Sequence, residues 1–283
     1  MFFTTLVSVT GLAAHLDDPD WIVCDCRHDL VDTESGHRAY AESHIPGSRL
    51  VRLDEDMSGP RNGKNGRHPL PDPETFCKRL GELGIDNGKQ VVAYDASGGC
   101  YAARLWWMLR WLGHAHAAVL DGGWEAWVKA GRPVTSGQPA IKPVSFAARE
   151  MPRLAVDAAY VAAHLNQAEI CVLDARSAER FRGENETLDP VGGHIPGAVN
   201  RFYKYNLDTD GCFRSAVELH EEFSDLIGAH ALQNVLHQCG SGVTACHNLL
   251  AMEIAGLPGS RLYPGSWSEW VSDPLRPVAT GGV

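Results

Sequence analysis

The chain has 283 residues, of which 44% are hydrophobic and 21% are charged, and 35 acidic against 25 basic side chains give a formal net charge of −10. This length leaves room for two hydrophobic cores, and the composition is that of ordinary globular domains rather than of a disordered chain. The negative charge, together with the lack of any lysine- or arginine-rich run in the sequence, argues against a nucleic-acid partner.

The amino-terminal stretch 1–7 is apolar but has no basic residue, and it soon reaches Asp17 and Asp18. It therefore predicts neither a secretory signal nor a membrane span. The eight cysteines do not have the spacing of a disulfide framework. We expect reduced thiols, a cytoplasmic location and no membrane partner.

In chain order, four short apolar runs predict buried parallel strands. They are 21–25, 91–94, 170–174 and 235–238. Segments 102–112 and 244–255 carry apolar residues three and four positions apart and stop before glycines, which is typical of helices. Strands that alternate with helices predict an α/β fold with a mostly parallel sheet flanked by helices.

Three motifs occur twice in the same order, about 140 to 150 residues apart. They are Asp25-Cys26-Arg27 and Asp174-Ala175-Arg176, His44-Ile45-Pro46-Gly47 and His194-Ile195-Pro196-Gly197, and Asp121-Gly122-Gly123-Trp124-Glu125-Ala126-Trp127 and Pro264-Gly265-Ser266-Trp267-Ser268-Glu269-Trp270. This order predicts a duplicated domain of ordinary size. Because 132–152 is rich in proline and has no sustained period, we expect domains at 1–138 and 154–283 and a linker at 139–153.

Cys239 follows the apolar run Val235-Leu236 at the end of the predicted strand 235–238 and begins the small-residue loop Cys-Gly-Ser-Gly-Val-Thr (239–244). Glycines let the loop backbone turn inward, and successive N–H groups before a helix favour negative charge on the sulfur. The sequence therefore predicts a nucleophilic thiolate. When the halves are aligned, Asp95 takes the place of Cys239, so we expect the first domain to be inactive and the second to be catalytic.

These motifs together resemble the tandem-domain rhodanese family of sulfurtransferases over roughly residues 20 to 278. The loop is similar to that of 3-mercaptopyruvate sulfurtransferases, whereas thiosulfate-specific members usually have Arg and Lys in the places of Gly240 and Ser241. The resemblance implies two rhodanese-like domains without cofactor or metal. It also implies transfer of sulfur from 3-mercaptopyruvate, through a Cys239 persulfide, to cyanide, a thiol or thioredoxin, with release of pyruvate. Thiosulfate is the alternative donor.

The same resemblance assigns the donor-binding residues. Arg180 matches the arginine that holds the substrate carboxylate, although it could also be a solvated surface charge. The loop residues Gly240, Gly242, Val243 and Thr244 are implied to surround the sulfur. A second substrate arginine is common just before the Gly-His-Ile-Pro-Gly motif, but none stands in 186–192. Arg182 or Arg201 could take its place.

The family also suggests a proton relay of Ser241, His68 and Asp54, in which the serine and histidine protonate the leaving enolate. His68 could equally be an ordinary exposed loop residue, because the preceding loop 61–66 is longer than is usual. The asparagine- and glycine-rich sequence of that loop does not decide between the two.

Several other residues are expected to be structural. Arg27 and Arg176 should pair with Asp25 and Asp174, since the pair recurs in the inactive half. The histidines and tryptophans of the repeated motifs, which recur in the same way, should support turns and cores: His44, His194, Trp124, Trp127, Trp267 and Trp270.

Two rival functions are weighed against sulfur transfer. A rhodanese-like phosphatase loop needs an arginine about six residues after the cysteine, and Ala245 stands there. A non-catalytic sulfur carrier or regulatory binding module remains open, although the intact Cys239 loop opposes it. Cys246 and His247 lack further ligands at metal-binding spacing, so no metal is expected.

Overall fold

The computed structural model describes residues 2–165 and 167–282, and its contacts divide the chain into two compact units. The first unit runs up to residue 59 and includes 70–151 and 209–213. The second comprises 60–69, 152–208 and the residues from 214 onward. A short segment of the first half of the sequence, 60–69, therefore packs within the second unit. The predicted domain limits at 138 and 154 stay a prediction.

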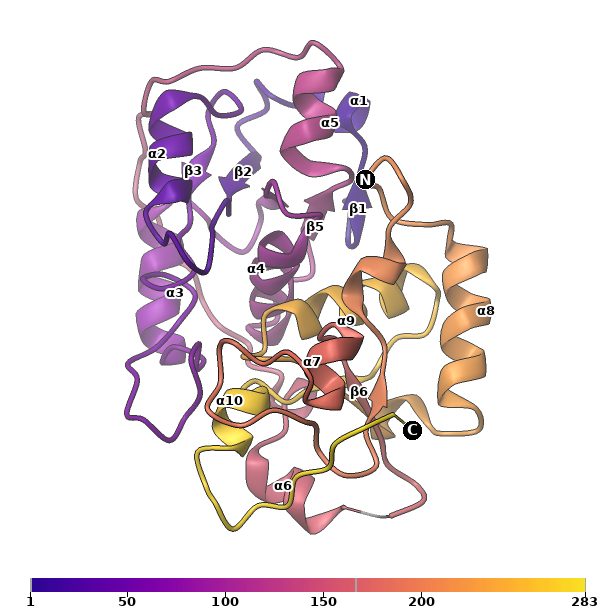
Figure 1. Cartoon of the computed structure of the whole chain (residues 1–283). Coiled ribbons are helices and arrows are strands. Elements are labelled where there is room, and N and C mark those ends of the chain that lie inside the picture. The colour runs from indigo at the N-terminus through magenta and orange to yellow at the C-terminus, as the bar shows by residue number, and fades with distance from the viewer. Residues whose placement is uncertain (1, 166, 283) are drawn as a thin grey trace. The chain divides into compact units, whose positions relative to one another are not determined.

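The first unit is built on a five-stranded parallel sheet in the order β1-β5-β4-β2-β3. Figure 1 labels β1, β2, β3 and β5 of this sheet. Its strands are β1 Leu6–Val7, β2 Trp21–Asp25, β3 Arg49–Leu50, β4 Gln90–Tyr94 and β5 Ala117–Leu120. Its helices are α1 Val9–Ala13, α2 Ser35–Glu42, α3 Pro73–Glu82, α4 Cys100–Trp111 and α5 Gly123–Lys129.

The second unit repeats this plan with a four-stranded parallel sheet in the order β7-β6-β8-β9. Its strands are β6 Cys171–Asp174, β7 Val199–Asn200, β8 Val235–Gln238 and β9 Arg261–Leu262. Its helices are η1 Pro152–Leu154, α6 Ala158–Ala163, α7 Ala178–Arg182, η2 Tyr203–Asn206, α8 Ala216–Ile227, η3 Leu232–Asn234, α9 Thr244–Ile254 and α10 Ser266–Trp270.

The predicted α/β fold with parallel sheets is confirmed. All four predicted strands form within one residue of their expected limits, and every residue in them is buried, including the polar His237 and Gln238 of β8. In each unit the strand that precedes the aligned Asp95 or Cys239 lies inside the sheet, between two neighbours. The residue at its carboxyl end is therefore held at the edge where parallel α/β sheets bind ligands.

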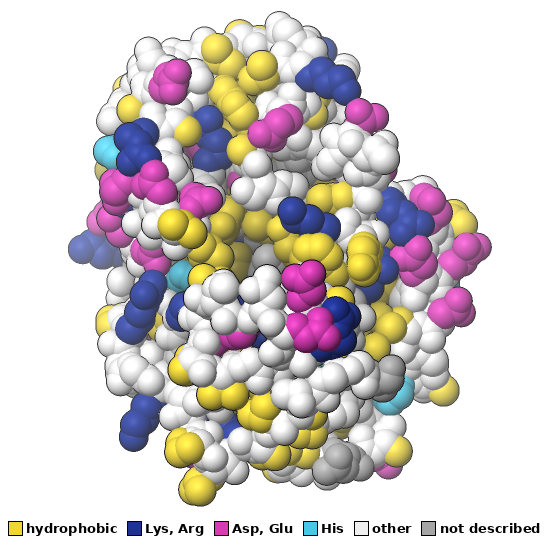
Figure 2. All heavy atoms as spheres, viewed as in Figure 1, with side chains coloured by type: hydrophobic (Ala, Val, Ile, Leu, Met, Phe, Trp, Pro, Cys, Tyr) yellow, Lys and Arg dark blue, Asp and Glu magenta, His cyan; other side chains and the backbone are white. Residues whose placement is uncertain are grey.

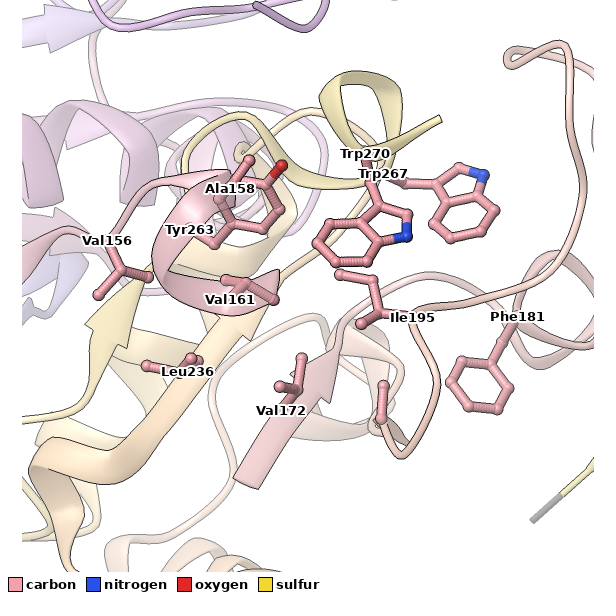
Figure 3. Close-up of a cluster of buried hydrophobic side chains, with 11 residues drawn as sticks. Val156, Ala158, Val161, Val172, Phe181, Ile195, Leu236, Tyr263, Trp267 and Trp270 are labelled. Carbon is pink, nitrogen blue, oxygen red and sulfur yellow. The ribbon is translucent and has the colours of Figure 1, made fainter. Parts of the chain in front are cut away.

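Tryptophans of the repeated motif fill the core of each unit, as the sequence predicts. Trp127 in the first unit and Trp270 in the second are fully buried, and their indole N–H groups donate to the carbonyls of Pro133 and Pro277. Figure 3 places Trp267 and Trp270 in one cluster with apolar side chains from the sheet and its loops. A buried indole needs such a hydrogen-bond acceptor, so the motif serves packing in both halves.

The repeated histidines are equally structural. His44 Nδ1 lies 2.7 Å from the carbonyl of Tyr40, and its ring stacks on that tyrosine. His194 Nδ1 lies 2.8 Å from the carbonyl of Phe181 and stacks on its ring. Each histidine thus fastens the turn of its Gly-bearing motif to the preceding helix, α2 or α7.

The surface carries charges of both signs. On the face drawn in Figure 2, acidic and basic side chains are interspersed over both the early and the late parts of the chain. Within residues 2–165 and 167–282, none of the helices has both the length and the apolar character that crossing a bilayer requires.

Asp95 fills the loop of the first unit with its own carboxylate. Oδ1 accepts from the N–H groups of Ser97 and Gly99, and Oδ2 accepts from those of Tyr101 and Ala102, at 2.7 to 2.9 Å. Burial raises the pKa of Asp95, and the four N–H groups oppose that rise. The loop is therefore an anion cradle whose occupant is part of the chain.

Replacing Asp95 with alanine should leave these four buried N–H groups without an acceptor. We expect Asp95→Ala to lower the free energy of unfolding of the first unit by about 3 kcal/mol, as buried unsatisfied donors do. Denaturant unfolding followed by tryptophan fluorescence measures it, with the exposed Asp17→Ala as control. A loss below about 0.5 kcal/mol, which is usual for a surface site, would contradict the account.

Candidate active site

Cys239 lies directly after β8, at the carboxyl end of an inner strand, and α9 begins five residues later at Thr244. Its thiol is free and the residue is only 2% exposed. The neighbouring Val243 is buried and forms the N-terminal cap position of α9. The thiol thus sits in a short loop between a buried strand and the amino end of an eleven-residue helix, where backbone N–H groups favour an anion.

The repeated motif at 264–270 fixes the backbone of this loop. At the start of α10, Ser266 has φ +53°, and the next two N–H groups donate to the loop carbonyls: Trp267 to Cys239 at 3.0 Å and Ser268 to Gly240 at 2.9 Å. The Ser266 hydroxyl accepts the N–H of Cys239 at 3.1 Å. The carbonyls of Cys239 and Gly240 are therefore both engaged by N–H groups of α10.

The first unit has a corresponding hydrogen bond and a residue with positive φ next to Asp95. Gly123, with φ +57°, takes the place of Ser266, and the N–H of Trp124 donates to the carbonyl of Asp95 at 2.9 Å. That backbone binds a carboxylate through four N–H groups. The second loop differs at its cap, where Val243 has φ −90° in place of φ +88° at Gly99, and the N–H of Cys246, aligned with that of Ala102, donates to the carbonyl of Val243. We infer that the remaining N–H groups of the second loop are available to a thiolate, a persulfide or a bound anion.

His68 and Ser241 lie together beside the loop. His68 Nδ1 is 2.7 Å from Ser241 Oγ, and both residues are buried, at 3% and 6% exposure. His68 is therefore not an exposed loop residue. Asp54 belongs to the first unit, where its carboxylate lies 3.8 Å from His28 Nε2. The pair of His68 and Ser241 has the geometry of proton transfer, and the role of all three residues as a relay stays a prediction.

Arg180, at the carboxyl-terminal part of α7, is held by two buried carboxylates. Its Nε and Nη2 donate to Glu186 at 2.9 to 3.2 Å, and Nη2 also donates to Asp189 at 3.2 Å. Burial opposes the ionisation of Glu186, but the bonds from Arg180 and from the loop N–H groups hold its pKa below the usual value. Burial raises the pKa of Asp189. Nη1 of Arg180 lies 3.6 Å from the position that a Cβ on Gly240 would take.

A second guanidinium, which the sequence did not indicate, also reaches this loop. Arg67 pairs with Asp189 through Nη1, and its backbone N–H donates to Ser268 Oγ at 3.0 Å. Its Nη2 lies only 2.7 Å from the position of a Cβ on Gly240. Arg67 adjoins the predicted His68, but nothing in the local sequence pattern of 60–69 predicts that this segment folds onto α10.

The two arginines predicted as possible substitutes for the second substrate arginine form ion pairs with other residues. Arg182 is paired with Glu184 near the surface, and Arg201 is paired with Glu222 of α8. Their predicted donor-binding role is untested and gains no support from these contacts. Arg176 binds Asp174 through Nε and Nη2 and lies 4.7 Å from the ring centre of Trp267.

The local salt bridge predicted for Arg176 is thus confirmed. Arg27 makes the same pair with Asp25 in the first unit. In the described part of the chain, no group of three or more His, Cys, Asp or Glu side chains is arranged to hold a metal ion.

The two units share one strand order around a parallel sheet, and the second has a buried cysteine at the end of an inner strand. These features define a duplicated α/β protein with a cysteine-bearing loop in its second unit. The family model for the rhodanese-like domain matches residues 8–130 and 157–273. The chain belongs to the rhodanese family.

Similar proteins cover almost the whole chain. A probable 3-mercaptopyruvate sulfurtransferase of Pseudomonas aeruginosa is 48% identical over 98% of both chains. A putative thiosulfate sulfurtransferase of Mycobacterium tuberculosis is 36% identical over 98% of this chain and 97% of its own length. The solved 3-mercaptopyruvate sulfurtransferase from Leishmania major superposes with a TM-score of 0.85 at 31% identity, covering 97% of this chain and 75% of that one.

The loop depends on the glycine at 242. Gly242 has φ +77°, and a Cβ there would lie 2.3 Å from the carbonyl oxygen of Pro264. Gly242→Ala should therefore displace the loop and slow the reaction of Cys239 with iodoacetate by about tenfold or more, since both backbone strain and a clash oppose the native conformation. Gly197→Ala is the matched control, because φ is +78° there but the space is open. Equal effects of the two changes on Cys239 would contradict this.

Proposed function

We propose that this chain is a sulfurtransferase that takes sulfur from 3-mercaptopyruvate, holds it as a persulfide on Cys239 and passes it to a thiol or cyanide. The observation that carries the proposal is the buried Cys239 at the end of β8, inside a loop whose carbonyls are held by α10 and whose aligned copy binds a carboxylate. The similarity to named 3-mercaptopyruvate sulfurtransferases supports the choice of donor.

In the first half-reaction, the Cys239 thiolate attacks the sulfur of 3-mercaptopyruvate. A new S–S bond forms, the C–S bond breaks, and its electron pair leaves with the carbon as the enolate of pyruvate. The enolate takes up a proton and becomes pyruvate, while the terminal sulfur of the persulfide loses its own. The N–H groups of the loop stabilise the resulting persulfide anion.

The proton reaches the enolate through Ser241 and His68. Their 2.7 Å contact allows the serine hydroxyl to donate to the enolate while the imidazole supplies the next proton. Since Nδ1 of His68 contacts Ser241, the hydrogen-bond partner of Nε2 determines which of the two nitrogens carries the proton. Asp54 as the third member of the relay is part of this proposal.

In the second half-reaction, cyanide or a thiolate attacks the outer sulfur, and the electron pair of the S–S bond returns to Cys239 as the thiolate. Thioredoxin or a small thiol is the proposed physiological acceptor, with neither nucleic acid nor membrane as a partner. The eight free cysteines support work in a reducing compartment, for which we propose the cytoplasm.

Thiosulfate is the second candidate donor. Thiosulfate-specific relatives have an arginine in the place of Gly240, and here the guanidinium of Arg67 stands where a side chain at 240 would begin. Relatives named thiosulfate sulfurtransferases are 34 to 36% identical to this chain. The position of Arg67 and these relatives together favour thiosulfate as a second donor that is used in addition to 3-mercaptopyruvate.

Cys239→Ser should abolish transfer from either donor. Pyruvate or sulfite release with cyanide as acceptor should fall by about 10³-fold or more, as expected for loss of a nucleophile. In the wild type, the peptide that contains Cys239 should gain the mass of one sulfur atom on treatment with 3-mercaptopyruvate. Cys77→Ser, in the first unit, is the control. Activity that survives in Cys239→Ser would overturn the mechanism, and a wild type inactive with both donors would favour the non-catalytic carrier.

Ser241→Ala should separate the two donors. Proton delivery is needed by the leaving enolate but not by leaving sulfite, so persulfide formation should slow by about 100-fold with 3-mercaptopyruvate and by less than about threefold with thiosulfate. Stopped-flow measurement of a single turnover reports this step directly. Ser97→Ala, at the aligned position of the first unit, is the control. Equal slowing with both donors would mean that Ser241 shapes the loop rather than delivers a proton.

A further inference from the structure

We propose that Arg67 is the second donor-binding cation of the Cys239 site and, with Arg180, holds the anionic end of the sulfur donor. This rests on the proposed function for the identity of the donor. The segment 186–192, where related enzymes often place a second arginine, contains two carboxylates instead and no arginine. The missing positive charge comes from a segment that lies more than a hundred residues earlier in the sequence.

The position of Arg67 relative to the loop carries the inference. Its Nη2 and the Nη1 of Arg180 lie 2.7 and 3.6 Å from the place of a Cβ on Gly240, the residue that follows the nucleophile. In the described part of the chain, the hydrogen bonds of the Arg67 guanidinium are made by Nη1, and those of the Arg180 guanidinium by Nε and Nη2. For Arg180, the carboxylate-bound Nη2 lies as near, at 3.5 Å, as Nη1, so both guanidiniums reach the same side of the loop.

Arg67 is a fixed part of the site rather than a mobile surface side chain. Its backbone N–H is bound to Ser268 Oγ, and that same residue donates its own N–H to the carbonyl of Gly240. The preceding Gly66 has φ +82°, and a Cβ there would lie 2.7 Å from the carbonyl of Gly265. The segment that carries Arg67 is therefore seated on the same turn that fixes the Cys239 loop.

Asp189 joins the two arginines. One carboxylate oxygen pairs with Arg67 and the other with Arg180, and the carboxylate is almost completely buried. A planar guanidinium bound in this way loses little further freedom when it binds an anion, and it can present two parallel N–H groups to a carboxylate or to a sulfonate-like group. The small Gly240 makes room for the Arg67 guanidinium beside the loop, because a Cβ there would lie 2.7 Å from its Nη2.

The test compares two alkylating reagents that differ in charge. Iodoacetate carries a carboxylate and iodoacetamide does not, so the ratio of their rates at Cys239 reports the cationic groups beside the thiol, whatever the natural donor is. Mass spectrometry of the Cys239 peptide gives both rates. Arg67→Gln should lower the ratio about tenfold or more, because a charge-assisted hydrogen bond to the anion is lost. Arg67→Lys should restore part of it.

Arg38→Gln is the matched control, since Arg38 is an exposed arginine of the first unit that is also paired with an aspartate. An unchanged ratio in Arg67→Gln would overturn the proposal. An equal loss of rate with both reagents would also overturn the proposal. It would mean that the substitution displaces the loop and that the charge of Arg67 does not contribute to binding the iodoacetate carboxylate.

Steady-state kinetics gives the second readout. With 3-mercaptopyruvate, Arg67→Gln should raise KM about tenfold or more while kcat changes by less than about threefold, because the interaction is made in the ground state as well as in the transition state. An unchanged KM would overturn the role of Arg67 and leave the proposed function intact. A wild type without turnover would overturn the proposed function, and the alkylation ratio would still decide the role of Arg67.

Discussion

The carbonyl oxygen of Cys239 accepts a hydrogen bond from the N–H of Trp267, and the orientation of the whole nucleophile loop depends on this bond. A carbonyl engaged on the α10 side is not directed at the sulfur, which removes one repulsive dipole from the neighbourhood of a thiolate. The bond requires φ +53° at Ser266, which is costly for a residue with a Cβ. The Ser266 hydroxyl offsets that cost, because it bonds both the N–H of Cys239 and the carbonyl of Tyr263.

The first unit indicates what such a loop is built to bind. Its turn has the same positive φ, at Gly123, and the same bond from Trp124 to the carbonyl of Asp95. At the end of the strand, the carboxylate of Asp95 reaches back and occupies four N–H groups. The second unit has a thiol there, its cap residue Val243 has φ −90° where Gly99 has φ +88°, and the N–H of Cys246 donates to the carbonyl of Val243.

The sequence predicts the features that depend on residues close together in the chain. Buried parallel strands are continuous apolar runs, and the duplicated motifs reveal two units and the equivalence of Asp95 with Cys239. The position of Arg67 could not be predicted, because its carboxylate partner Asp189 and its backbone partner Ser268 lie 122 and 201 residues away in the sequence. Asp189 stands in a segment that lacks an arginine, yet its carboxylate pairs with both Arg67 and Arg180.

The charge balance of the site bears on donor choice. Arg67 and Arg180 face the loop, but Glu186 and Asp189 are buried against them, so the site offers directed N–H groups with little net positive charge. Two unpaired arginines would favour a dianion such as thiosulfate over a monoanion by their Coulomb field alone. When each is neutralised by a carboxylate, that advantage shrinks, and the fit of hydrogen bonds to the anionic group decides instead. A balanced pair of arginines is thus better suited to the single carboxylate of 3-mercaptopyruvate.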